Sequence, residues 1–426
     1  MARVFETDIT LNAQRELRLA DADSSAYVGF KAPSTITTNR IWTLPATDGT
    51  SSQVLSTNGS GVLSWATAGG GGGLTHFVES EETASPNDTV PVDALTATDA
   101  SYTDIDVALV AKGTGATLAQ VPNGTTAGGN KRGTYATDLQ KARASSGRVA
   151  SGNYSVIAGG YGNGTSGGYA STVGGFSNQA SSNYSFVGGG QSNEAKTNTH
   201  ATCVGGSSND ATGQYSFVGG GISNTASGLR SVVVAGDTNA ASGANSCIVG
   251  GIDNIANASQ SFVAGGRRGT VRSIVGNHIF PACSIPIANA QGATQSALLL
   301  LGRQTTDATA TVLCSDSSAA GTTNQVILPN NAAYYFRGSV IAGVTAGGDS
   351  KAWTFEGAIK RGANAASTAI VGTVVLNTIA QDAGASAWTV AVTADTTNGG
   401  IKVEVTGAAA TTIRWVCKIN TTEMTY

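Results

Sequence analysis

The sequence predicts an all-β protein with a roll of stacked rungs at its centre and an antiparallel β-sandwich at its C-terminal end. Three observations predict this fold: a 15-residue repeat in the middle of the chain, closely spaced strand-like runs after it, and a composition that disfavours helices. Glycine supplies 57 of the 426 residues, and only 12 % of the residues are charged. Such a composition suits turns and tightly stacked strands.

The central segment, residues 151–282, repeats one pattern eight times. The repeats begin at Tyr154, Tyr169, Tyr184, His200, Tyr215, Arg230, Asn245 and Gln260. Every step is 15 residues long except one of 16, which places a single extra residue near Asn198. A fixed period of this kind predicts a solenoid in which each repeat forms one rung. At a strand spacing of about 4.8 Å, eight rungs give a rod roughly 35–40 Å long.

Three columns of equivalent residues recur in the rungs. Glycine permits a positive φ or a close backbone approach, and stacked asparagines can form a ladder of side-chain amides. The asparagine column consists of Asn163, Asn178, Asn193, Asn209, Asn224, Asn239 and Asn254. Alanine recurs two positions later, from Ala180 to Ala256, and leaves room for only a thin core.

The strand positions of the rungs are apolar at two successive residues. The clearest pairs are Phe186 and Val187, Phe217 and Val218, Val232 and Val233, and Phe262 and Val263. Adjacent strand residues point to opposite faces, so both faces need cover. One face lines the interior of the roll, and we expect a partner copy of the chain to cover the other.

The repeat Ser-x-x-x-Gly-Gly-x-x-Asn-x-Ala-Ser-Gly, between Ser151 and Asn277, resembles the head of YadA-like trimeric autotransporter adhesins. This resemblance implies a left-handed parallel β-roll and an intertwined homotrimer. Phage fibres use the same rolls. Autotransporters also carry a secretion signal, a coiled-coil stalk and a membrane anchor, and the sequence shows no pattern for any of these.

Residues 1–73 are predicted to form an N-terminal attachment segment that ends in a glycine linker, Gly69–Gly73. The runs Tyr27–Pro33, Asn39–Pro45 and Gln53–Trp65 resemble the N-terminal segment of tailed-phage fibres, especially those of marine and cyanobacterial phages. The resemblance implies docking to a phage tail or baseplate protein. The alternative is an extended β-rich stalk without a docking role.

Residues 74–150 are predicted to form a β-rich cap that starts the roll, because terminal rungs need covering. Tyr102–Ala111 alternates polar and apolar residues, as a strand does. Thr137–Arg143 is predicted as a short helix with Thr137 as its N-cap. The glycines of Gly128–Gly133 lack the spacing of a phosphate-binding loop.

Residues 283–426 carry strand-like runs without the rung period, which predicts a sandwich, jelly-roll-like in character. The runs are Thr309–Cys314, Gln325–Leu328, Ala333–Ile341, Lys351–Lys360, Ala369–Asn377, Trp388–Thr393, Ile401–Thr406 and Ile413–Ile419. A sandwich at the end of a rod resembles the tip domain of phage receptor-binding proteins. Its aromatic residues Tyr334, Tyr335, Trp353 and Trp388 are candidate receptor contacts, although alternation places at least half of them in the core.

Catalysis is not expected. Glycoside cleavage needs two nearby carboxylates, and Glu194 and Asp210 occupy one column on neighbouring rungs, about 5 Å apart by the rung spacing. We interpret them as solvated turn residues. The aromatic column from Tyr154 to Tyr215 can bind sugar faces or simply pack against itself.

No cofactor, metal, nucleic acid or membrane partner is predicted. The five cysteines and three histidines are scattered, so we expect free thiols and no metal site. The net charge of −3 does not suit nucleic-acid binding, and the longest apolar run, Ala297–Leu301, is too short to span a membrane.

The patterns and resemblances together predict a homotrimeric tail fibre of a phage virion, which binds a host-surface glycan or outer-membrane component without catalysis. The alternatives are a bacterial trimeric surface adhesin and a tailspike polysaccharide depolymerase.

Overall fold

A computed structural model describes residues 11, 15–39, 41–51, 53–67, 77–82, 92–97 and 109–426. The chain divides into two compact units, Met1–Ala108 and Leu109–Tyr426. The predicted glycine linker Gly69–Gly73 lies outside the described residues, as does Tyr102–Ala108 of the strand expected there. The remaining Leu109–Ala111 is irregular.

Within its described residues, the first unit contains three antiparallel strand pairs. Their strands are β1 (Leu17–Ala20) with β2 (Tyr27–Phe30), β3 (Gln53–Thr57) with β4 (Leu63–Thr67), and β5 (Phe77–Glu82) with β6 (Val92–Ala97). In the second hairpin the Trp65 indole Nε1 donates to the carbonyl of Thr47 at 2.7 Å. The ring lies against Gly49, where a Cβ would come within 2.6 Å of it. Glycine at this position therefore lets the tryptophan fold back over the loop.

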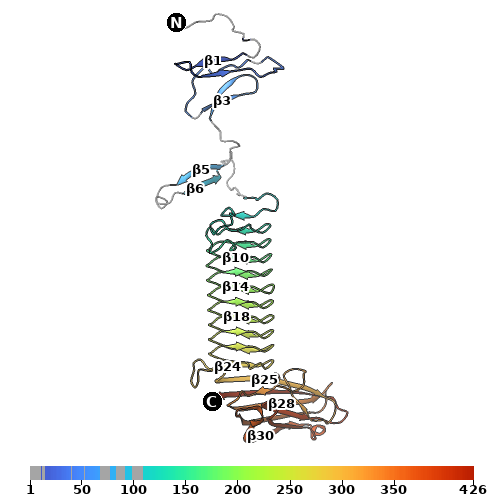
Figure 1. Cartoon of the computed structure of the whole chain (residues 1–426). Coiled ribbons are helices and arrows are strands. Elements are labelled where there is room, and N and C mark those ends of the chain that lie inside the picture. The colour runs from blue at the N-terminus through green and yellow to red at the C-terminus, as the bar shows by residue number, and fades with distance from the viewer. Residues whose placement is uncertain are drawn as a thin grey trace. The chain divides into compact units, whose positions relative to one another are not determined.

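The second unit begins with a parallel solenoid of about ten turns (Figure 1). One ladder of two-residue strands continues from rung to rung: β7 (Thr117–Leu118), β8 (Thr137–Asp138), β9 (Val156–Ile157), β11 (Ser171–Thr172), β13 (Phe186–Val187), β15 (Thr202–Cys203), β17 (Phe217–Val218), β19 (Val232–Val233), β21 (Cys247–Ile248), β23 (Phe262–Val263) and the four-residue β24 (His278–Pro281). This arrangement confirms the predicted parallel roll, and its ladder begins upstream of residue 151.

A second parallel ladder closes each rung on its other side. Its strands are β10 (Gly164–Thr165), β12 (Gln179–Ala180), β14 (Glu194–Ala195), β16 (Asp210–Ala211), β18 (Thr225–Ala226), β20 (Ala240–Ala241) and β22 (Ile255–Ala256). Single bridges, from Ala142–Tyr161 to Ile252–Arg267, form a third row. In both ladders the second residue of each strand from β9 to β23 is buried inside the roll.

The predicted glycine column is required by the stacking. Gly175 adopts φ +83°, and a Cβ there would lie 2.2 Å from the carbonyl oxygen of Gly190 in the next rung. Equivalent clashes of 2.0–2.3 Å arise at Gly160, Gly190, Gly206, Gly221, Gly236 and Gly251. A side chain at this position would therefore push neighbouring rungs apart.

The predicted asparagine ladder is present and fully buried. Asn178 donates through Nδ2 to the carbonyls of Gly174 at 2.8 Å and Gly190 at 2.9 Å, and its backbone N–H donates to Asn163 Oδ1 at 2.9 Å. Gln140 ends the ladder on the N-terminal side, because its Oε1 accepts from the Asn163 N–H at 3.0 Å. Each asparagine thus satisfies backbone groups of two rungs, which is the condition for burying them.

The predicted helix Thr137–Arg143 is wrong. Thr137–Asp138 is strand β8, and the following residues are irregular. The Asp138 carboxylate is buried and accepts from Arg132 Nε at 2.8 Å and from Arg143 Nη2 at 3.4 Å. Pairing with two buried guanidinium groups holds this segment in the first rungs, and that tertiary contact overrides the local helical pattern.

The C-terminal part is an antiparallel sandwich. One sheet has the order β30 (Ala369–Gln381), β29 (Ser350–Arg361), β28 (Ala332–Val344), β33 (Ile413–Thr425) and β25 (Thr294–Thr305). The other contains β26 (Thr311–Val312), β32 (Gly400–Thr406), β27 (Val326–Ile327) and β31 (Thr389–Asp395). Both sheets bury side chains in one core around Trp353, Trp388 and Trp415. Short 3-10 turns at Ala365–Ser367 and Ala383–Ala385 are the helical elements of the described residues.

All eight predicted C-terminal runs contain strands, whereas β24 and β25 were not predicted. The sequence of β25 includes four successive leucines, so apolar residues stand on both of its faces: Leu299 and Leu301 are buried, and Leu300 is 56 % exposed. A strand of this kind lacks the alternation from which the other strands were predicted.

Strand β24 joins the roll to the sandwich. It pairs in parallel with β23 and antiparallel with β25, so one continuous sheet of 16 strands runs from β7 to β30 (Figure 1). Across this junction the buried carboxylate of Glu423 accepts from Gln295 Nε2 at 2.7 Å and pairs with Arg272 Nε at 3.3 Å. Shared backbone pairing and these polar contacts fix the sandwich to the end of the roll.

Candidate functional site

The two carboxylates considered for catalysis are adjacent, as their column predicts. Glu194 and Asp210 are paired residues of β14 and β16. The ammonium group of Lys196 contacts Glu194 Oε2 and lies 3.5 Å from Asp210 Oδ2. Hydrogen bonding to Glu194 raises the pKa of Lys196. Gln179 Nε2 also donates to Glu194 at 2.9 Å. The pair is thus part of a polar surface cluster in which a lysine occupies the space between the carboxylates.

The aromatic column forms a continuous stack. The rings of Tyr135, Tyr154, Tyr169, Tyr184, His200 and Tyr215 follow one another with centroid separations of 4.9–5.2 Å. Each interior ring has a neighbour on both faces, so only the ring edges remain open. A sugar that stacks on an aromatic face has no place along this ladder, which favours the interpretation that the rings pack against one another.

The predicted packing residues separate into two sets. Val187, Val218, Val233 and Val263 are completely buried in the roll. Phe186, Phe217, Val232 and Phe262 point outward and remain partly exposed.

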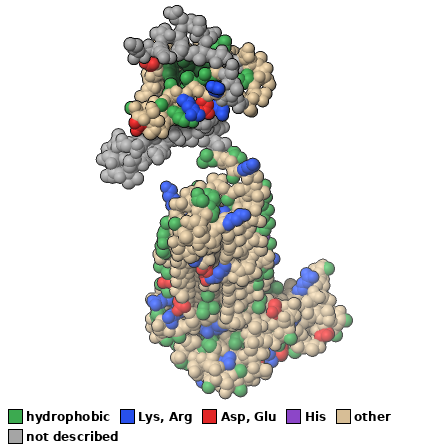
Figure 2. Space-filling model, turned by 45° about the horizontal axis from the view of Figure 1, so that its top comes forward, with side chains coloured by type: hydrophobic (Ala, Val, Ile, Leu, Met, Phe, Trp, Pro, Cys, Tyr) green, Lys and Arg blue, Asp and Glu red, His purple; other side chains and the backbone are tan. Residues whose placement is uncertain are grey.

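The outward face of this ladder is largely apolar, with Ser171 and Thr202 as the polar members of its column. Strands β11, β15, β19 and β21 are each followed by a valine that points outward. These residues are Val173, Val204, Val234 and Val249, and they are 42–48 % exposed. Two residues after Phe186 and Phe217, the chain has glycine instead of valine, at Gly188 and Gly219. A Cβ at either glycine would lie 3.2–3.3 Å from the phenylalanine ring. In Figure 2 charged side chains are sparse on the roll.

The structure does not support the predicted role of Tyr334, Trp353 and Trp388 as receptor contacts. All three are 2–3 % exposed and lie in the sandwich core, where they have no access to a receptor. Tyr335 alone of the four points outward and is 45 % exposed. Its hydroxyl donates to Glu356 Oε2 at 3.0 Å.

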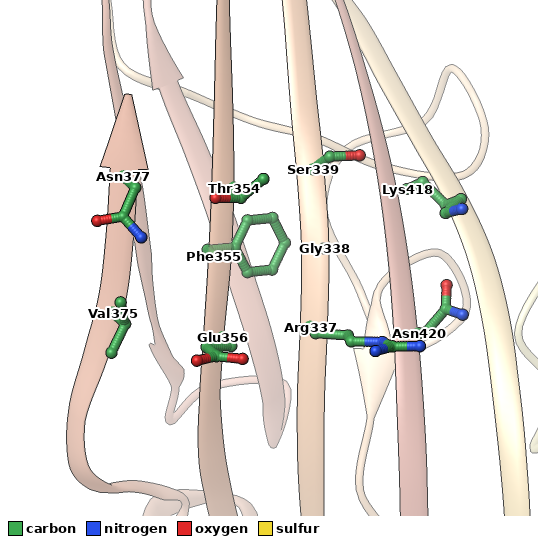
Figure 3. A pocket seen from close by; sticks show the side chains of 10 residues that line it. All are labelled: Arg337, Gly338, Ser339, Thr354, Phe355, Glu356, Val375, Asn377, Lys418 and Asn420. Carbon is green, nitrogen blue, oxygen red and sulfur yellow. The ribbon is translucent and has the colours of Figure 1, made fainter. Parts of the chain in front are cut away.

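A hollow of about 420 Å³ lies on the outer face of the large sheet, and its lining includes Glu356, the partner of the Tyr335 hydroxyl (Figure 3). It is lined by Arg337, Gly338, Ser339, Thr354, Phe355, Glu356, Val375, Asn377, Lys418 and Asn420. The register of β28, β29, β30 and β33 arranges its outward side chains in two rows. One row is Val375, Glu356, Arg337 and Asn420, and the other is Asn377, Thr354, Ser339 and Lys418.

Two backbone features shape the hollow. The pairing of β29 with β30 shifts register between Glu356 and Ala358, and such a bulge bends a strand. Gly338 has no side chain, and the Phe355 ring occupies the position that its Cβ would need, at 2.3 Å. Sequence reasoning missed this site because the strand-like runs do not reveal the pairing register, including that of β28 with the distant β33, which places these side chains in shared rows.

The cysteines are free, as predicted. Burial raises the pKa of the Cys203 and Cys417 thiols to about 12, which keeps them as inert thiols. Within the described ranges there is no group of three or more potential metal ligands, and no helix has the length and apolar character needed to cross a membrane.

No protein-family model and no curated protein matches the chain. Among solved structures, the tailspike protein of Acinetobacter baumannii phage AM24 aligns over 63 % of this chain and 53 % of its own, at 9 % identity and a TM-score of 0.19. The tailspike of A. baumannii bacteriophage Fri1, a capsular polysaccharide depolymerase, aligns over 72 % and 58 %, at 7 % identity and a TM-score of 0.18. The tailspike of Acinetobacter phage vB_ApiP_P1 aligns over 64 % and 56 %, at 12 % identity and a TM-score of 0.16.

This chain therefore spans little more than half the length of each neighbour. TM-scores of 0.16–0.19 carry no argument about the fold or the activity of the chain.

Proposed function

We propose that the chain is a non-catalytic tail-fibre protein of a phage virion that attaches the particle to its host. The observation that carries this proposal is the roll of stacked rungs joined to a sandwich through one continuous sheet. A roll and a sandwich that share one sheet form a rigid spacer with a binding domain at its end. The roll provides length, the sandwich contacts the host surface, and the N-terminal segment binds a tail or baseplate protein.

The sequence patterns support the phage assignment. The runs Tyr27–Pro33, Asn39–Pro45 and Gln53–Trp65 resemble the N-terminal segments of tailed-phage fibres, and the repeat resembles rolls that such fibres share with YadA-like adhesins. The bacterial adhesin remains the alternative for the repeat alone. The N-terminal resemblance favours the virion.

The working assembly in this proposal is a homotrimer. The apolar outward face of the β9–β23 ladder supports it, because an exposed apolar surface of this length is typical of an interface. Three tips on one fibre raise avidity without a tight single site.

The non-catalytic part of the proposal rests on the surroundings of Glu194 and Asp210. Lys196 lies between the two carboxylates, where a hydrolase needs space for a glycosidic bond. The pair also belongs to the outward positions of the second ladder.

Adsorption to cells tests the proposal. Fluorescently labelled full-length protein is incubated with a panel of cyanobacterial and other marine bacterial strains, and bound fluorescence and released reducing ends are measured together. We expect saturable adsorption to some strains without release of reducing ends. Absence of adsorption to every strain contradicts attachment. Adsorption with release of reducing ends contradicts the non-catalytic assignment and supports a depolymerase.

A further inference from the structure

We propose that the hollow on the outer face of the sandwich binds an acidic sugar, one that carries a carboxylate, in a host-surface polysaccharide. This inference rests on the proposed attachment function and names its ligand class and residues. Arg337 and Lys418 hold the sugar carboxylate. The amides and hydroxyls in the same two rows hold the sugar hydroxyls.

The net positive charge of the side chains that line the hollow favours a negatively charged ligand. Arg337 and Lys418 are exposed, and none of the ion pairs formed among the described residues includes either of them. Glu356 is the one acidic residue of the lining and already accepts from the Tyr335 hydroxyl. The lining therefore carries two cations and one anion, on a chain whose net charge is −3. The planar guanidinium of arginine is well suited to a carboxylate.

The neutral polar groups of the hollow match a carbohydrate. Asn377 and Asn420 each offer an amide donor and acceptor, and Ser339 and Thr354 each offer a hydroxyl. All four residues stand on paired strands, so the register of the sheet sets their backbone spacing before a ligand arrives. Figure 3 shows these polar side chains side by side on neighbouring strands of the sheet. The volume of about 420 Å³ lies within the range of roughly 300–1,000 Å³ that small-ligand sites occupy.

Tyr335 adds an apolar contact at one end of the hollow. It lies on β28 two residues before Arg337, so both side chains are on the outer face of the sheet. Its hydroxyl is fixed by Glu356 at 3.0 Å, while the side chain is 45 % exposed. An amphipathic ring that is held at its polar end offers a surface for the apolar face of a sugar.

A second copy of the chain is a poorer occupant of this site. The cores of protein interfaces are depleted of charged residues, whereas Arg337, Glu356 and Lys418 stand within two adjacent rows here. The apolar face of the roll provides the surface that self-association needs.

Binding is tested with acidic oligosaccharides and their methyl esters, which keep the sugar rings but replace the carboxylate charge with a neutral ester. The full chain is titrated by isothermal calorimetry with trigalacturonate, a hyaluronan tetrasaccharide and 3′-sialyllactose, each as acid and as ester. We expect weak binding of at least one acid, with an affinity at least about tenfold above that of its ester. The double variant R337Q/K418Q is expected to lose a similar factor, because each glutamine keeps a polar group but removes the charge.

Arg414→Gln is the matched control. Arg414 is exposed on the same strand as Lys418, outside the hollow, and its loss is expected to leave binding unchanged. Equal binding of acids and esters, binding of none of the acids, or full binding by R337Q/K418Q overturns the inference. In the cell-adsorption assay, a double variant that adsorbs like the unmodified chain would show that this hollow is not the receptor site, while the attachment function would stand. A lack of adsorption by the unmodified chain would contradict the proposed attachment function itself.

Discussion

Asn224 illustrates, at the scale of single residues, how the roll buries its backbone. Its Nδ2 donates to the carbonyls of Gly220 at 2.9 Å and Gly236 at 2.8 Å, and its Oδ1 accepts from the Asn239 N–H at 3.0 Å. A buried peptide group without a partner costs about 1–3 kcal/mol. One amide per rung therefore replaces the water that these turns would otherwise need.

Stacking of the aromatic rings offsets part of the free-energy cost of the backbone conformation that these residues adopt. The members of this aromatic ladder hold left-handed φ angles between +55° and +64°: Tyr135, Tyr154, Tyr169, Tyr184, His200 and Tyr215. Such angles cost a non-glycine residue about 1–3 kcal/mol. Stacking of the rings returns part of that cost, since aromatic pairs contribute about 0.5–1.5 kcal/mol each.

Two neighbouring glycines give a matched test of rung stacking. At Gly221, with φ +91°, a Cβ would lie 2.0 Å from the carbonyl oxygen of Gly236, whereas at Gly220 it would meet no atom within 4 Å. Gly221→Ala is expected to lower the free energy of unfolding by at least roughly 1–3 kcal/mol. Gly220→Ala is expected to change it by less than about 0.5 kcal/mol. Guanidinium melts of both variants measure the difference, and equal stability would contradict the close stacking.

At the scale of elements, the first rungs are closed by a buried charge cluster. The Asp138 carboxylate lies between Arg132 and Arg143, and all three side chains are almost fully buried. Burial lowers the pKa of Arg132, and the Asp138 charge opposes that shift. Arg132 Nη1 also donates to the carbonyls of Gly128 at 2.6 Å and Asn130 at 2.8 Å. The cluster thus ties the loop before β8 across the N-terminal end of the roll.

Asp138→Asn tests this cap. The substitution keeps the shape but leaves two buried guanidinium groups without a counter-charge, which is expected to cost about 3–5 kcal/mol. Amide hydrogen exchange is expected to accelerate in the first rungs, around β8 and β9, and to stay slow near β23. Asp237→Asn, which removes a more exposed carboxylate from a later rung, is the control. Unchanged exchange at β8 and β9 would show that the cap does not depend on this charge.

Prediction from the sequence succeeded where contacts repeat at a fixed interval. The 15-residue period defines which residues of neighbouring rungs touch, so the glycine and asparagine columns have a direct structural meaning. It failed at Thr137–Arg143, because the buried ion pairs of Asp138 with Arg132 and Arg143 hold this segment in the first rungs. The hollow around Arg337 was not predictable, since its rows depend on the register of β28, β29 and β30 and on the pairing of β28 with the distant β33.

At the scale of the whole molecule, the continuous sheet has one outward face that is largely apolar along the roll, interrupted by Ser171 and Thr202. Phe186, Phe217 and Phe262 stand in one column, with exposed valines beside it. In the second ladder the outward residues include Glu194 and Asp210 instead. The proposed contact between copies of the chain would cover this apolar face and so account for the difference between the two faces.

A double substitution on that face tests the assembly without disturbing the interior of the roll. F186D/F217D changes two outward side chains and retains the buried Val187 and Val218. We expect sedimentation velocity to show a trimer for the unmodified chain and a smaller species for the variant, because an unpaired carboxylate is costly in an apolar interface. Gln191→Asp adds charge at an exposed position of the third row and is expected to leave the trimer intact. A stable folded monomer of the unmodified chain, or a trimer that survives both substitutions, would contradict assembly through this face.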